Sequence, residues 1–416
     1  MKSLLFIFPL LFFLLFSCDN DLNINENWKD IPVIYGVLNS GTGEDLDNNG
    51  DPDENFNHFV RIQKSFLGPE SAYTYTSIYD SLYYNPSDLK VWLETVNNQN
   101  GEVTGPYELE LIDESQLDLL SIYKEEGLFA TEAHYLYKIP NVASDLVPFD
   151  DLRMDYKINV LNMITGDTTF SQTNIVEPLQ MSRPTLDNLL SSILSFTQPI
   201  QIKPSQHAKM YTISLRFNYI EQHKDDYQYD IEQGNPLPTT GVVYKYIDWN
   251  LGTVEADENQ LFGNSVETVK KYITTTQFFE FIKSQIVEED ISSPQYYRYP
   301  VNTVNQGTGG GVPVGIYHGT VDLNITAVNS ELYTYLNANS PNYGINQERP
   351  EYNNIENGVG HWSSRSVLNM NNLLLTSTIM DSLAFGEITN SLNFACYSTL
   401  GTMGLVVSFG FDCEED

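Results

Sequence analysis

Alternation of apolar and polar residues with a period of two is the dominant pattern along this chain, and it predicts half-buried β-strands. Before residue 178 the alternating segments are rich in β-branched and aromatic residues, and clusters of Gly, Asn, Pro or Asp separate them. These segments are residues 33–38, 58–64, 89–94, 107–111, 135–139, 156–161 and 169–172. Such spacing is typical of an immunoglobulin-like β-sandwich, which we expect over residues 31–178, with Gly166 in a hairpin turn.

Beyond Pro178 the pattern predicts a larger β-rich domain over residues 179–416, with a few short helices as insertions. Strands are expected at residues 211–219, 243–249 and 321–327. The first of these has one wholly apolar face, formed by Tyr211, Ile213, Leu215, Phe217 and Tyr219. Helical spacing predicts a connector at 186–194 and helices at 277–288 and 330–336. The helix at 277–288 is expected to bury Phe278, Phe281, Ile282 and Ile286.

The start of the chain has the pattern of a secretory signal peptide, with Lys2 followed by an almost unbroken apolar run over residues 4–16. This run is shorter than the ~20 apolar residues of a membrane-spanning helix. It ends in Leu15-Phe16-Ser17-Cys18, which resembles the lipobox of bacterial lipoproteins, whose cysteine becomes acylated. We therefore predict a signal peptide at residues 1–17, lipid attachment at Cys18 and a tether over residues 18–30.

The charge of the chain narrows its possible partners. The formal net charge is −34, from 21 basic and 55 acidic residues. Nucleic acid and anionic lipid surfaces attract Lys and Arg, so nucleic-acid binding is not expected and membrane association must come from the acyl chains. The same charge favours cations and cationic partners.

An acidic segment at residues 45–53 is the most specific candidate for a metal site. Oxygen-bearing side chains stand at alternate positions, namely Asp45, Asp47, Asn49, Asp51 and Asp53. With Gly50 at the sixth position, this spacing matches the start of an EF-hand-like calcium loop, in which Asp51 would contribute its backbone carbonyl. Phe56 stands where such a loop has its bidentate glutamate, so we predict weak Ca²⁺ binding. The alternative is a solvated acidic hairpin loop.

Two cysteines remain after Cys18, and their state is left open by the sequence. Cys396 and Cys413 form an even pair in an exported chain, which favours a disulfide, but two free thiols are the competing interpretation. Neither has the spacing or the neighbouring histidines of a metal site.

Residues 349–365 form a second distinctive segment, in which Gly358 and Gly360 precede Trp362. A structural turn packed on a core is the preferred interpretation over a ligand site, with Arg365 available to pair with Glu351 or Glu356. The string Asn-Ile-Glu-Asn-Gly-Val-Gly-His-Trp-Ser-Ser-Arg at 354–365, with residues 35–38 and 60–68, resembles uncharacterised surface lipoproteins of Bacteroidota.

The resemblance implies location and architecture more than activity. Similar lipoproteins are held in the outer membrane and often work beside TonB-dependent transporters, so it implies an accessory role in nutrient capture. The start of the mature chain, Asp19-Asn20-Asp21, is loosely similar to signals that send such lipoproteins to the cell surface. We therefore expect surface display, with the periplasmic face as the alternative.

The remaining motifs give little support for catalysis. The glycine-rich segment 305–311 lacks the Gly-Lys-Ser/Thr of a phosphate loop and is expected to be a mobile loop. The six histidines are scattered, without a metal or nucleophile signature. The leading hypothesis is a noncatalytic protein that binds a ligand or partner. An adhesion or assembly module is second, favoured by an unpaired sheet edge, and a glycan-active hydrolase is third.

Overall fold

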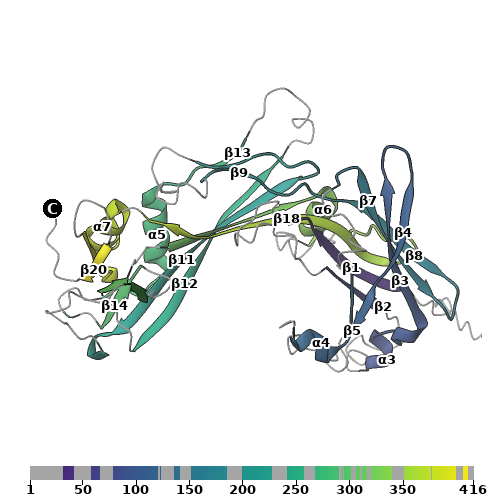
Figure 1. Ribbon diagram of the computed structural model, residues 1–416, viewed down its shortest axis with the longest axis horizontal. Coiled ribbons are helices and arrows are strands. Elements are labelled where there is room, and N and C mark those ends of the chain that lie inside the picture. Colours follow the sequence, from purple (N-terminus) through teal and green to yellow (C-terminus); the bar gives the residue numbers. More distant parts are fainter. Residues whose placement is uncertain are drawn as a thin grey trace, which may run out of the picture.

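The computed structural model describes residues 31–41, 58–65, 78–119, 122, 135–140, 151–184, 199–226, 241–256, 268–289, 293, 295–300, 306–309, 312–315, 320–339, 351–375, 377–399 and 406–410. The protein is mainly β with a few short helices, which confirms the predicted fold class. Two lobes are joined by long strands that cross between them (Figure 1). Within the described residues no helix is both long enough and apolar enough to cross a bilayer. The predicted signal peptide, tether and 186–194 connector lie outside these residues.

One nine-stranded sheet extends through both lobes, with strand order β12-β11-β17-β18-β1-β2-β6-β5 and β14 paired to β11. Its strands are β1 (Pro32–Asn39), β2 (Phe59–Lys64), β5 (Glu110–Ile112), β6 (Leu136–Lys138), β11 (Met210–His223), β12 (Val242–Glu255), β14 (Tyr296–Tyr299), β17 (Thr320–Val328) and β18 (Val359–Leu374). Strand β18 links the lobes, because it pairs in parallel with β1 from Val359 to Arg365 and antiparallel with β17 from Arg365 to Leu374.

The first lobe is a two-layer sandwich. A second sheet has the order β4-β3-β7-β8 and contains β3 (Leu89–Asn97), β4 (Val103–Glu108), β7 (Met154–Asn162) and β8 (Thr168–Asn174). Its apolar face packs against β1, β2 and β18 around a shared core that includes Ile34, Val60, Leu93, Ile158 and Trp362. The two-sheet arrangement is compatible with the expected immunoglobulin-like fold, whose connectivity stays a prediction.

Of two local predictions in this lobe, the turn at Gly166 is confirmed and the strand at 107–111 is wrong. Gly166 has φ 78°, which confirms the predicted turn between β7 and β8. The single strand expected at 107–111 is wrong, because the chain changes sheets at Leu109. Strand β4 ends at Glu108 in one sheet and β5 begins at Glu110 in the other.

The second lobe has its core between the large sheet and the helices α5 (Thr275–Gln285) and α7 (Ser377–Phe385). The predicted apolar face of β11 is confirmed, since Tyr211, Ile213, Leu215, Phe217 and Tyr219 are all buried. Helix α5 begins two residues earlier than expected, because Thr274 and Gln277 form a capping box at its N-terminus. Its core side differs in one residue: Phe279 is buried, whereas Phe281 is partly buried and stacks on Trp249.

Shorter elements complete the described chain. They are α3 (Tyr79–Leu82), α4 (Glu114–Leu119), α6 (Ser330–Ala338), η1 (Pro86–Asp88), η3 (Lys224–Asp226), η5 (Asn390–Leu392), β9 (Met181–Arg183), β10 (Ile200–Ile202), β13 (Val269–Lys271), β15 (Gln306–Gly309), β16 (Val312–Gly315), β19 (Cys396–Thr399) and β20 (Val406–Gly410). The mobile loop expected at 305–311 is wrong for Gln306–Gly309, which pairs with β16. Val312 and Val314 favour a strand, and ladder pairing requires only backbone groups from the glycines.

The junction between the lobes is built on polar contacts from β18. The hydroxyl of Ser364 accepts a hydrogen bond from the Val176 amide, and that of Ser366 accepts one from the Leu179 amide. The fully buried Asn329 donates to the Thr173 hydroxyl and caps helix α6. The expected division into residues 31–178 and 179–416 stays a prediction. The first core also draws on the C-terminal part of the chain, through Trp362.

Candidate functional site: the open edge of strand β12

Most of the site residues predicted from the sequence lie outside the described residues. These are Cys18, Cys413 and the calcium-loop residues Asp45, Asp47, Asn49, Asp51 and Asp53. Cys396 is the first residue of β19, where its backbone pairs with Gly410. In the part of the chain that the structure describes, no group of three or more His, Cys, Asp or Glu side chains is placed to hold a metal ion. The lipid site, the calcium site and the disulfide stay predictions.

The segment around Trp362 has a structural role, as preferred from the sequence, but only part of it is a turn: the chain turns at Asn357 and Gly358 and then continues as strand β18, which contains Trp362. Trp362 is fully buried, and its indole Nε1 donates to the backbone carbonyl of Tyr156 at 2.8 Å. Gly360 has φ 121°, and a Cβ there would lie 2.0 Å from the Ile34 carbonyl oxygen, so only glycine fits. The suggested pairing of Arg365 is not observed, because none of the ion pairs among the described residues joins it to Glu351 or Glu356.

The same segment covers the outer edge of β8. Glu356 forms a backbone bridge with Phe170, and the hydroxyl of Ser171 donates to the Asn354 carbonyl at 2.7 Å. The Asn354 side chain in turn bonds both the amide and the carbonyl of Trp362. Exposed sheet edges are templates for association, and covering them with a loop is a common protection.

Other edges of the described sheets are also protected. Strand β4 contains Pro106, which has no N–H to offer to another strand, and β5 is only three residues long. Strand β14 is covered by the chain after η5, because Arg298 bonds the backbone of Asn393 and Ala395. The edges of the small sheets are three to five residues long.

Strand β12 is the exception. It is 14 residues long and contains no proline, and no other described strand pairs along its outer side (Figure 1). Its bulge lies opposite Ile213 and Ser214, toward the C-terminal end, so the preceding stretch is regular. Three large apolar side chains in that stretch are exposed: Val243 (55%), Tyr244 (57%) and Tyr246 (59%). A long, regular edge with exposed β-branched and aromatic residues is the geometry that other strands join.

Arg216 holds the exposed aromatic side of β12 in place. Its guanidinium binds Asp248 through two hydrogen bonds of 2.7 and 2.9 Å, and it lies 4.0 Å from the centre of the Tyr246 ring. The hydrogen bonds to Asp248 raise the pKa of Arg216 above its ordinary value. The charge pair thus places a cation against the face of the exposed Tyr246 ring.

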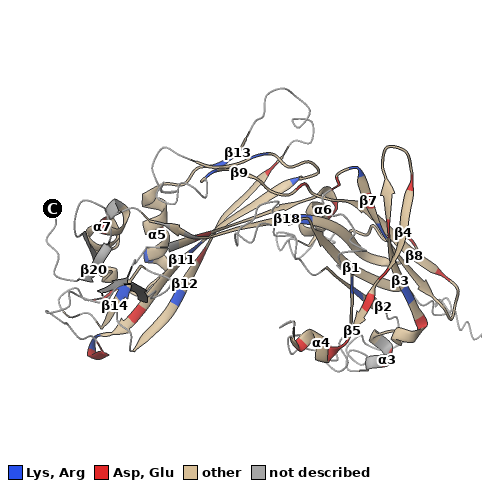
Figure 2. Cartoon of the chain, in the orientation of Figure 1, with Lys and Arg blue, Asp and Glu red and all other residues tan. Residues whose placement is uncertain are grey.

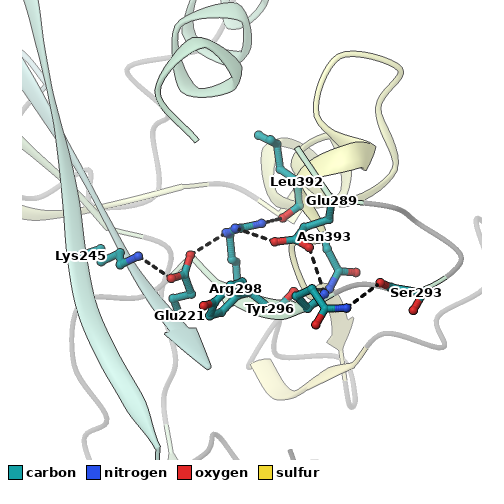
Figure 3. A network of polar contacts seen from close by, with 9 residues as sticks. Glu221, Lys245, Glu289, Ser293, Tyr296, Arg298, Leu392 and Asn393 are labelled. Carbon is teal, nitrogen blue, oxygen red and sulfur yellow. Dashed lines mark hydrogen bonds and ion pairs between the residues drawn. The ribbon is translucent and has the colours of Figure 1, made fainter. Parts of the chain in front are cut away.

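A buried polar network fixes β12 to the interior of the lobe from the other side (Figure 3). Lys245 on β12 donates to Glu221 on β11, and Glu221 accepts a second bond, of 3.0 Å, from Arg298 on β14. The Arg298 side chain also reaches Glu289 at 3.1 Å and the Leu392 carbonyl at 2.6 Å. Two carboxylates and two cations balance one another, so the network holds the edge rigid without leaving a net charge.

Charges of both signs lie near the edge of β12, on a chain that is acidic as a whole. Asp226 abuts Gly241, immediately before β12, and Glu255 ends the strand. Lys245 and Arg216 are both engaged by carboxylates, whereas Lys224 precedes Asp226 in η3 and Lys271 of β13 lies near Gly252. Acidic residues are spread over both lobes (Figure 2), in line with the net charge of −34. An approaching partner therefore meets exposed apolar side chains on a chain of acidic net charge.

A second cluster that the sequence does not single out surrounds His361. Its ring is buried, stacks on Tyr335 of α6 with 4.0 Å between ring centres, and meets the edge of Tyr35. Neither ring nitrogen has a hydrogen-bond partner among the described residues. Burial lowers the pKa of His361 to about 4. The ring is therefore neutral near pH 7 and packs as an aromatic residue.

Comparisons with known protein families, with curated proteins and with solved structures found no match to this chain. The β12 edge was missed at the sequence level as well. The alternation over residues 243–249 predicts the strand, but whether a strand lies at an edge depends on partners distant in the sequence. The only local signal is that three large apolar side chains, at positions 243, 244 and 246, lie too close together for one buried face.

Proposed function

We propose that this protein is a noncatalytic, lipid-anchored accessory protein that binds a protein partner through strand β12. The observation that carries the proposal is the unprotected edge of β12, with Val243, Tyr244 and Tyr246 exposed, whereas the other sheet edges among the described strands are short or protected. Association at such an edge buries apolar area and completes a row of backbone hydrogen bonds. A small ligand would gain little from a strand edge, so the geometry favours a polypeptide.

The predicted partner is an outer-membrane transporter of the TonB-dependent class, as the resemblance of the sequence motifs implies. Anchoring through Cys18 would hold this protein in the same membrane as the transporter. Confinement to one membrane raises the effective concentration of the two proteins relative to one another. The unpaired edge of β12 also supports the alternative, an adhesion or assembly module, which would use the same edge to bind a different protein. The identity of the bound protein separates the two.

Site-specific photocrosslinking in the native cell tests this function. A photoreactive amino acid at Tyr244 should give one dominant adduct, and mass spectrometry of that adduct should identify an outer-membrane transporter. Tyr272 offers a matched control, because it is equally aromatic and 66% exposed but lies outside β12. Equal adducts from both positions, or none at Tyr244, would overturn the proposal. A dominant adduct with an adhesin or a second copy of the chain would support the alternative.

We also propose that the loop at residues 45–53 binds Ca²⁺ in a structural role. Four acids packed closely repel one another until a cation neutralises them, and loop spacing suits the flexible coordination of Ca²⁺ better than the octahedral demand of Mg²⁺. Calorimetric titration of the mature protein should give binding heats with an affinity near 10⁻⁴–10⁻³ M. The double variant Asp47→Ala, Asp53→Ala should abolish them, and identical heats from both proteins would leave the solvated-turn interpretation.

A further inference from the structure

We infer that the partner segment bound at β12 is an extended, basic stretch of polypeptide that pairs with β12 as an additional strand. The inference rests on the proposed function and adds to it both the mode of binding and the chemistry of the segment. It depends on three features: the regular backbone of β12, the exposure of its side chains, and the acidic net charge of the chain.

The backbone of β12 is prepared for strand addition. Residues from Val242 to Trp249 pair with β11 in continuous register, without a bulge. The bidentate contact between Arg216 and Asp248 joins the two strands on one face, and the contact between Lys245 and Glu221 joins them on the other. Because β12 is held on both faces, it loses little conformational freedom when a partner binds. Little of the free energy of the new backbone hydrogen bonds is therefore offset by the cost of ordering β12.

The exposed side chains supply neighbours for an added strand. Val243 and Tyr246 lie on opposite faces of the strand, because side chains alternate along it. A β-branched or aromatic residue placed opposite either one forms the kind of cross-strand pair that stabilises sheets. A segment that pairs with β12 as a strand therefore needs apolar residues along its length. A partner that packs on one face of the sheet does not have this requirement.

The net charge of the chain determines which sign of segment is attracted. Local charges beside β12 are mixed, because Asp226 and Glu255 at its ends have Lys224 and Lys271 nearby, and Lys245 and Arg216 are engaged by carboxylates. The whole chain, at −34, attracts a basic segment and repels an acidic one. This net charge also disfavours a second copy of the chain as the occupant.

Peptide titration of the full-length mature protein in detergent micelles tests the inference. The probe is a fluorescent octapeptide of alternating Lys and Val, followed by anisotropy. Methylation of two adjacent central amides removes an N–H from each edge while leaving the charge intact. We expect the first peptide to bind and the methylated one to bind at least about fivefold more weakly, since one of its two lost N–H groups would face β12 and a hydrogen bond is worth about 1 kcal/mol. An octapeptide of alternating Glu and Val should not bind.

Substitution locates the site. Tyr244→Lys places a like charge opposite the basic peptide and should weaken binding about fivefold, whereas Tyr272→Lys should leave it unchanged. Equal binding of the plain and methylated peptides would overturn strand addition, and tighter binding of the acidic peptide would overturn the basic segment. Either failure leaves photocrosslinking at Tyr244 as a separate test of the proposed function, because that experiment depends on proximity alone.

Discussion

Gly36 and Trp362 show how closely single residues are matched in the first lobe. A Cβ at Gly36 would lie 2.4 Å from Cζ3 of the Trp362 ring, and the ring is held by its bond to Tyr156. We expect Gly36→Ala to lower the free energy of unfolding by about 1–3 kcal/mol, measured by urea denaturation. In a Trp362→Leu background, where the ring is absent, the same substitution should cost much less. Equal costs in the two backgrounds would show that the ring is not responsible.

His361 gives a pH dependence of known sign. Its pKa is about 4 in the folded protein and 6.5 in the unfolded chain, so the unfolded chain binds the proton first as pH falls. The stability that the neutral ring contributes is present above pH 6.5 and is lost as the pH falls from 6.5 toward 4. At pH 4.5 this effect makes the free energy of unfolding about 2–3 kcal/mol lower than at pH 7.

Comparison with His361→Phe isolates this effect. The substituted ring retains the aromatic packing on Tyr335 but cannot take up a proton. The variant should therefore lose less stability than the parent between pH 7 and pH 4.5 in urea denaturation. Burial also lowers the pKa of His58, which is present in both proteins and cancels in the comparison. The same pH dependence in parent and variant would contradict the assignment.

At the scale of the element, Arg298 is the residue on which the position of β14 and β11 depends. It is 2% exposed and neutralises both Glu221 and Glu289. Arg298→Met leaves these carboxylates buried without their shared partner, and we expect a loss of about 3–5 kcal/mol in the free energy of unfolding. Arg153→Met is the control, because Arg153 binds Asp151 in a similar bidentate contact at the surface. If both variants unfold at the parent's urea midpoint, the network is not stabilising.

Elements differ in how far the sequence predicts them. The apolar face of β11 is correct residue by residue, because strand alternation is a local property. The start of α5 is displaced because the capping residues precede the apolar pattern. The parallel pairing of β1 with β18 and the open edge of β12 could not be predicted, since each depends on a neighbour that is distant in the chain. Local sequence patterns therefore predict the strand β12 but not that its edge is open.

For the whole molecule, location follows from the predicted lipid on Cys18. Cys18→Ala should move the protein from the membrane to the soluble fraction or stall its processing, since no acyl chain remains to hold it. Fractionation followed by immunoblotting measures the change, and Cys396→Ala should fractionate like the parent. A Cys18→Ala protein that stays in the membrane after signal removal would refute the anchor.

The long strand β18 also constrains the order in which the molecule can form. The hydroxyl of Ser366 bonds the Gly41 carbonyl across 325 positions of sequence, and β1 obtains its parallel neighbour from the same strand. If the chain is exported from its N-terminus, β1 and β2 emerge early, and their sandwich cannot close until nearly the whole chain has followed. Contacts of such separation slow folding and leave strand edges exposed meanwhile. A chaperone that shields the early strands would therefore be most needed until residue 360 has been exported.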